Sequence, residues 1–134
     1  IMHFDDFFCN KNTLQYIHSK FNSTKTKWGL VGFNHLKYGV VCETIIPSRT
    51  LWGNPSTSFF INNKTDPIYF DEELVWVNDR EIHTTLLKKY GDPAIINDVC
   101  VTIKMHDGQV SKLLPTSILD NELKYFHNKH PEKI

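Results

Sequence analysis

The chain has no long hydrophobic run, no glycine-rich loop and no excess of charge of either sign. None of its apolar segments approaches the ~20 residues that a membrane-spanning helix needs, and its six glycines form no phosphate-binding pattern. Fifteen basic residues balance 15 acidic ones, whereas domains dedicated to nucleic acid usually show a clear basic excess. These absences exclude a helical membrane anchor and a phosphate-loop enzyme, and nucleic acid is not expected as a partner.

Cysteine is also scarce. Cys9, Cys42 and Cys100 cannot all pair within one chain, and none has another cysteine at CxxC spacing or a histidine at metal-ligand spacing. The chain shows no signal segment, so the sequence predicts three reduced, mostly buried thiols in a cytoplasmic protein. The seven histidines are spread singly along the chain. Neither a metal site nor a cofactor is expected.

The composition that remains is that of an ordinary globular protein. The 134 residues are 40% hydrophobic and 22% charged, which predicts one domain over 1–134 with a core of its own. Ile1 precedes Met2, so Met2 is the expected natural start. The polar residues 129–134 are expected to fray.

Three segments have the apolar spacing of helices. Residues 13–21 form the first, with Thr13 as a candidate N-cap. The second is 79–90, where Asn78 and Glu81 stand at the spacing of a capping box. The third runs from Thr116 or Ser117 to about 128 and is expected to bury four apolar side chains, those of Ile118, Leu119, Leu123 and Phe126.

The remaining apolar segments are predicted to be strands. Residues 27–33 and 39–46 form a hairpin with a five-residue connection, and 99–105 with 109–114 form a second one around His106, Asp107 and Gly108. Short strands are predicted at 58–62 and 68–70, and 73–77 is a further strand or the continuation of the last. The sequence therefore predicts an α+β domain: a twisted antiparallel sheet of about five to six strands with three helices packed mainly on one face.

The most informative segment is 66–81, which interleaves acidic and aromatic residues and holds one basic residue, Arg80. Acidic side chains attract a basic partner, and rigid aromatic rings supply contact area when they are desolvated. An ordinary solvated surface is the alternative interpretation. The predicted partner-binding residues are Asp66, Tyr69, Asp71, Glu72, Glu73 and Trp76, together with Trp52, which lies in the turn-rich loop 47–57 and either folds onto the core or is displayed.

A catalytic alternative is centred on residues 81–92. An apolar residue followed by His83, Thr84 and Thr85 resembles one of the paired motifs of the two-histidine phosphoesterases. The resemblance implies that the segment is a strand facing a cleft, where His83 moves a proton and Thr85 holds a phosphate oxygen. No other histidine is followed two residues later by Thr or Ser. If the segment is a helix instead, His83 is expected to be a solvated surface residue.

The sequence contains no complete active site, so we expect a binding protein rather than an enzyme. The favoured hypothesis is an immunity-type inhibitor, or antitoxin, whose acidic and aromatic face covers a basic partner such as a nuclease toxin. The first alternative is a phosphoesterase or RNA-processing enzyme that uses His83 and Thr85. The second is a structural or assembly component of a virus or phage. The sequence leaves the oligomeric state open.

Overall fold

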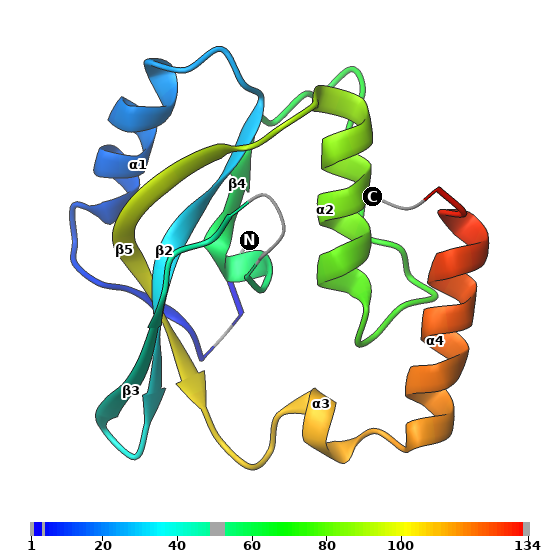
Figure 1. Ribbon diagram of the computed structural model, residues 1–134. Coiled ribbons are helices and arrows are strands. Elements are labelled where there is room, and N and C mark those ends of the chain that lie inside the picture. Colours follow the sequence, from blue (N-terminus) through cyan, green and yellow to red (C-terminus); the bar gives the residue numbers. More distant parts are fainter. Residues whose placement is uncertain (1, 4, 49–52, 133–134) are drawn as a thin grey trace.

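The computed structural model describes residues 2–3, 5–48 and 53–132, and it has the α+β class that the sequence predicts (Figure 1). Within these residues five strands and four α-helices are present. Their order is β1 (Phe7–Phe8), α1 (Thr13–Asn22), β2 (Trp28–Lys37), β3 (Val40–Ile45), the short 3-10 helix η1 (Pro55–Thr57), β4 (Ser58–Phe60), α2 (Asn78–Tyr90), β5 (Ala94–Met105), α3 (Val110–Leu113) and α4 (Thr116–Lys129).

The sheet is mixed, because its two longest strands are parallel. The strand order is β1-β5-β2-β3, and β4 pairs with β2 beyond the end of β3. β2 is antiparallel to β3 and β4 but parallel to β5, with pairs from Gly29 and Ala94 to Lys37 and Met105. The predicted antiparallel pairing holds for the outer strands but not for the central pair, because α2 carries the chain across to the other side of β2.

The first predicted hairpin is present, but its turn is shorter than expected. β2 continues to Lys37, and only Tyr38 and Gly39 connect it to β3. Both residues have positive φ, 51° and 79°. A two-residue turn of this kind matches the right-handed twist of the paired strands, which is why it replaces the five-residue connection.

Most of the strands predicted after residue 60 are not formed. Residues 68–70 and 73–77 have no regular secondary structure, and the second hairpin is absent because 110–113 is a short helix. The predicted strand 99–105 is the second half of the longer strand β5. Each segment wrongly predicted to be a strand is short and apolar. Periodicity alone does not assign such a segment to strand or helix.

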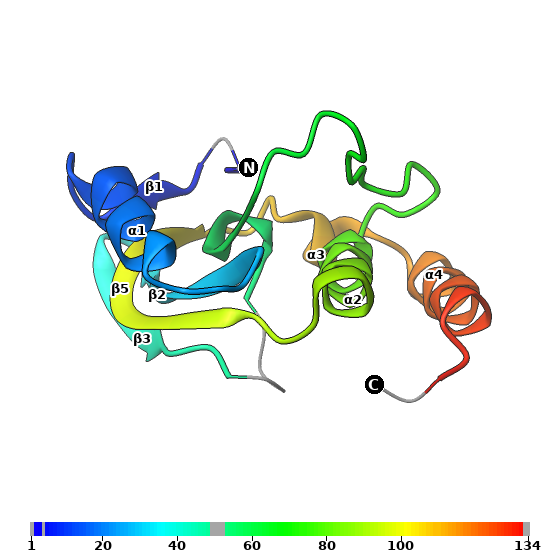
Figure 2. The same ribbon diagram turned by 90° about the horizontal axis from the view of Figure 1, so that it is seen from above.

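Two apolar clusters lie against opposite faces of β2. Ile17 of α1 packs in one cluster with Val31 and Phe33 of β2, and Ile82 and Leu86 of α2 pack in the other with Trp28 and Leu30. Successive side chains of a strand point to opposite faces, so the two helices cannot share one face. The expected packing of the helices mainly on one face is therefore wrong, and Figure 2 shows α4 lying beyond α2, away from the sheet.

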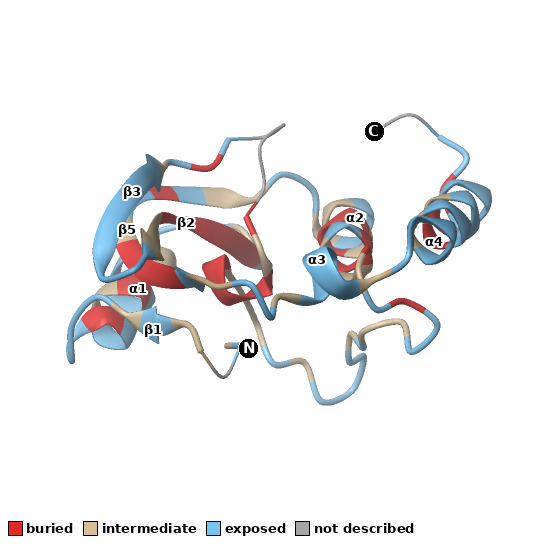
Figure 3. Ribbon diagram, turned by 90° about the horizontal axis from the view of Figure 1, so that it is seen from below, coloured by how far each residue is buried: buried red, intermediate tan, exposed pale blue. Residues whose placement is uncertain are grey.

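Its position leaves α4 largely exposed (Figure 3). The predicted helix is present, and Phe126 is buried as expected. Ile118 is exposed, however, and Leu119 and Leu123 are only half-buried. This helix packs against a single neighbouring layer, so one narrow stripe is covered instead of the wide apolar face that the sequence indicates.

Candidate functional site

The acidic segment predicted to bind a partner is divided between a loop and a helix. Residues 66–77 form the loop, and α2 begins at Asn78. The loop lies between α2 and α4 at the end of the molecule away from α1 (Figure 1). Its conformation is fixed by side chains of α4 and α2, as follows.

A buried carboxylate from α4 holds the end of the loop. Glu122 accepts hydrogen bonds from the backbone N–H groups of Val75 (3.0 Å), Trp76 (2.8 Å) and Val77 (3.0 Å). Donors at the start of a helix have no partner within the helix. The negative charge also lies at the positive end of the α2 dipole. Val77 is the N-cap residue of α2 and the other two residues precede it, so Glu122, which is 6% exposed, holds the start of α2 and the end of the loop from another helix.

The predicted capping box of Asn78 and Glu81 is not formed. The N-cap residue is Val77, and no side chain at that position makes a capping hydrogen bond. Glu81 is buried and turns toward α4, where its carboxylate lies 2.9 Å from Lys129 Nζ and 3.5 Å from His130 Nε2. The predicted frayed tail thus begins with two residues that contact α2: Lys129 is ion-paired to Glu81, and His130 Nδ1 lies 3.0 Å from Lys88 Nζ.

Asp71 is bound by α4 as well. Its carboxylate accepts hydrogen bonds from Lys129 Nζ at 2.5 Å and from the Tyr125 hydroxyl at 3.0 Å. The contact with Lys129 holds the pKa of Asp71 below its usual value. Desolvation acts to lower the pKa of Lys129, but the carboxylates of Asp71 and Glu81 outweigh it and raise that pKa. Lys129 therefore stays charged between two carboxylates.

Two further acidic residues of the segment are also engaged. Asp66 lies 2.6 Å from Lys89 Nζ of α2, and the same ammonium group donates to the Asp66 carbonyl at 3.1 Å. Asp79 is half-buried in the first turn of α2, and its burial raises its pKa. The predicted partner-binding residues therefore fall into two groups. Asp66 and Asp71 form the first group, because each is already ion-paired to a lysine of this chain.

The rest of the predicted residues form a small exposed surface. Tyr69 is 77% exposed and Val75 is 54% exposed. Glu72 and Glu73 are exposed between them and form no ion pair in the part of the chain that the structure describes. Trp76 is half-buried, and Trp52 lies outside the described residues. We call Tyr69, Glu72, Glu73 and Val75 the acidic loop surface.

His83, the centre of the catalytic alternative, is fully buried in α2. Its side chain is 0% exposed and stacks on Trp28, with ring centroids 5.9 Å apart. Desolvation lowers the pKa of His83 to about 4. The Thr85 hydroxyl instead donates a hydrogen bond to the Glu81 carboxylate at 3.1 Å. The expectation that a helical His83 is a solvated surface residue is wrong, and a buried ring on a helix gives the phosphoesterase alternative no support.

The described residues hold no candidate metal cluster and no helix that could span a membrane. They contain no group of three or more His, Cys, Asp and Glu side chains that could hold a metal ion. No helix in the described ranges is long and apolar enough to cross a membrane.

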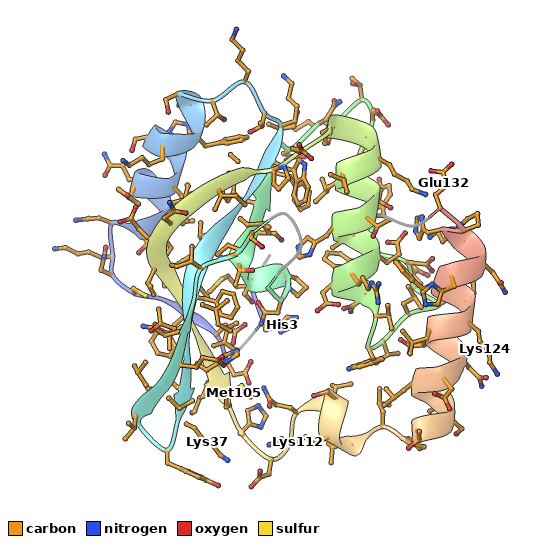
Figure 4. The ribbon with its side chains drawn as sticks, viewed as in Figure 1. His3, Lys37, Met105, Lys112, Lys124 and Glu132 are labelled. Carbon is orange, nitrogen blue, oxygen red and sulfur yellow. The ribbon has the colours of Figure 1, made fainter. Side chains whose placement is uncertain are left out.

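The residue that sequence reasoning missed is Glu122. It stands within the apolar stripe of α4, three residues after Leu119 and four before Phe126. An acidic residue at such a position is directed toward the neighbouring layer, as the buried Phe126 is. Lys124 is placed differently and points away from α2 (Figure 4). A charge inside an apolar stripe is therefore the signal that could have identified Glu122.

Comparison with protein-family models, curated proteins and solved structures found no match to this chain.

Proposed function

We propose that the chain is a non-enzymatic, immunity-type binding protein that covers a basic surface of a partner protein, such as the active site of a nuclease toxin. The observation that supports this role is a loop that is fixed at both ends and exposed in the middle. Lys89 holds Asp66 at one end and Glu122 holds Val75–Val77 at the other. Binding to a loop that is already ordered loses less conformational entropy than ordering it on contact.

The chemistry of the acidic loop surface suits a basic partner. Glu72 and Glu73 are two neighbouring exposed carboxylates that form no ion pair with any described residue, so their field extends into solvent and steers a positively charged protein toward the loop. Tyr69 then supplies an aromatic ring that gains free energy when it is desolvated. A nuclease that binds phosphate presents the basic surface that this arrangement requires.

The test is charge reversal of the two free carboxylates. The double variant Glu72→Lys, Glu73→Lys is compared with the natural chain for binding to a panel of purified basic nucleases, measured by association rate at low and high salt. We expect the association rate with a bound nuclease to fall by at least roughly tenfold at low salt, and the difference to shrink as salt screens the charges. Asp71 is unsuitable for this test because Lys129 and Tyr125 bind it.

A matched control makes the same change in net charge at a distance. Asp120→Lys with Glu132→Lys alters two exposed acidic residues, one on α4 and one after it, that lie outside the acidic loop surface. This variant is expected to keep most of the association rate. An equal loss of association rate in both variants would mean that net charge alone causes the effect. Unchanged binding by the loop variant at low ionic strength would contradict the proposed surface.

A further inference from the structure

Two cysteines face each other across the pairing of β1 with β5. Phe8 is opposite Val101 in this antiparallel pair, so the next residues in register are Cys9 and Cys100. The backbone N–H of Cys9 donates to the carbonyl of Cys100 at 3.0 Å, which confirms that the register continues. Residues joined in this way have Cα atoms about 5.5 Å apart. Disulfide-bonded cysteines most often show a similar separation.

The thiol of Cys9 also faces the part of β5 that carries Cys100. Cys9 Sγ is 3.6 Å from the Thr102 hydroxyl, and Thr102 is two residues from Cys100 on the same strand. Burial, and after it the neighbouring thiol of Cys9 and the carboxylate of Asp98, raise the pKa of Cys100 to about 11. Cys9 is exposed, whereas Cys100 is 2% exposed. One thiol is therefore open to a reagent in solution and the other lies behind it.

We propose that Cys9 and Cys100 are a reversible disulfide site that locks β1 to β5 when a low-molecular-weight disulfide, such as glutathione disulfide, is the oxidant. In the first step the Cys9 thiolate attacks one sulfur of glutathione disulfide, whose S–S bond breaks and releases one glutathione. In the second step the Cys100 thiolate attacks the Cys9 sulfur of the mixed disulfide and releases the second glutathione. Two protein thiols are oxidised and one small disulfide is reduced to two thiols.

The environments of the two sulfurs set the order and speed of these steps. The exposed Cys9 reacts first because the reagent reaches it. Cys100 is a thiolate only rarely at neutral pH, since its pKa is about 11. The second step is therefore slow, and its rate rises about tenfold per pH unit between pH 7 and pH 10.

Cys42 provides an internal comparison. It is exposed on β3, and its thiol lies 3.3 Å from the His35 carbonyl. β2, which pairs with β3, contains no cysteine. Cys42 is thus able to form a mixed disulfide but has no resolving thiol on the neighbouring strand.

The experiment uses the full chain carrying Cys42→Ser, converted at pH 6 to the mixed disulfide with glutathione and then transferred to higher pH. Intact mass and peptide mapping follow the loss of glutathione and the appearance of the Cys9–Cys100 peptide. We expect complete conversion, with the tenfold dependence on pH given above. The oxidised protein is expected to melt roughly 10 °C above the reduced protein, because the disulfide closes a long loop.

Two variants separate this site from general thiol reactivity. Cys100→Ser in the same background is expected to stop at the mixed disulfide, and Cys9→Ser is expected to leave Cys100 unmodified in the folded protein. Circular dichroism checks that both variants fold. If either does not, peptide mapping of the Cys42→Ser protein still tests whether the Cys9–Cys100 disulfide forms. A mixed disulfide that persists through pH 10, or glutathione lost only on unfolding, overturns the proposal. Neither result bears on the acidic loop surface.

Discussion

The sheet with α1 and the α2–α4 pair are held together by different interactions. On the sheet side, contact depends on apolar side chains such as Ile17, Val31 and Val101, which are buried between α1 and the strands. On the other side, α4 is joined to α2 and the loop by the hydrogen bonds and ion pairs of Glu122, Lys129 and His130, with Phe126 as its one fully covered apolar residue. Apolar contacts are insensitive to salt and pH, whereas charged contacts respond to both.

This difference suggests how the two regions divide their roles. α2 is attached to the sheet by Ile82 and Leu86, so it belongs to both regions. α4 lies outside that attachment and orients the loop 66–77 through polar groups that each need a specific geometry. The apolar region supplies most of the stability, and the polar region positions the exposed residues that we propose bind a partner.

The largest effect is expected from the apolar contact between α2 and the sheet. Leu86→Ala removes a fully buried side chain beside Trp28 and should lower the free energy of unfolding by about 4 kcal/mol, since the cavity is only partly refilled. Urea unfolding at low and high salt measures this loss of stability, which should be the same at the two salt concentrations. Leu14→Ala, at a residue 62% exposed, is the control and should cost less than about 0.5 kcal/mol.

The next effect tests the polar cap. Glu122→Ala leaves three backbone N–H groups without their acceptor and should lower the free energy of unfolding by about 3 kcal/mol. Glu122→Gln keeps one acceptor oxygen and should recover about half of the loss. Asp120→Ala, on the exposed side of the same helix, should change stability by less than about 0.5 kcal/mol. If Glu122→Ala proves as mild as Asp120→Ala, the polar contact does not hold the loop.

A third prediction uses pH at the boundary between the regions. The pKa of His83 is about 4 in the folded chain and about 6.5 when exposed, so the unfolded chain takes up the proton first. This residue's contribution is therefore constant above about pH 6.5 and falls by up to about 3 kcal/mol as the pH drops to 4. His83→Phe keeps a stacked ring and should remove that fall, as thermal melts at several pH values would show.

Other titrating groups are distinguished by their own variants and pH ranges. Burial and the nearby Lys88 also lower the pKa of His130, so His130→Phe measures its share in the same range. The stability from Asp71 is present above its unfolded pKa and is lost only at lower pH, because its folded pKa is depressed. His18→Phe, at an exposed residue, is the matched control. If the stability of His83→Phe still falls between pH 6.5 and pH 4, another group causes the pH dependence.

The smallest effect concerns the ion pairs of α4. Lys129→Met keeps the aliphatic stem but removes the cation between Asp71 and Glu81, and should cost about 1 kcal/mol at low salt because the Lys129 side chain is 40% exposed. The cost should decrease as salt is added, in contrast with Leu86→Ala. Lys124→Met, on the outer side of α4, serves as the control. A salt-independent loss would mean that the contact is one of packing.

Features encoded in neighbouring residues were predictable. The helices at 13–21, 79–90 and 116–128 follow from apolar spacing, and each agrees with the structure within one or two residues. The first hairpin was also predictable, although the sequence did not show that Tyr38 takes a positive φ. Among the site residues, the exposed Tyr69, Glu72 and Glu73 lie where the acidic pattern indicates a surface.

Features that depend on distant residues were not predictable. The parallel pairing of β2 with β5 joins Gly29 to Ala94, and no local pattern specifies it. The cap of α2 comes from Glu122, so the local Asn78 and Glu81 pattern was misleading. Burial of His83 depends on Trp28, which lies in another element. In each case a tertiary contact overrides a short-range preference.

The central strand pair also governs how quickly the chain can reach its folded form. β2 leaves the ribosome well before β5, and Val31 and Leu30 gain their partners Ile96 and Ile95 only after the whole intervening chain has been made. Until then an apolar strand edge is open to other molecules. Bringing together segments so far apart is slow, so a nascent or refolding chain passes through a period of vulnerability to aggregation and proteolysis that a purely local hairpin sheet would avoid.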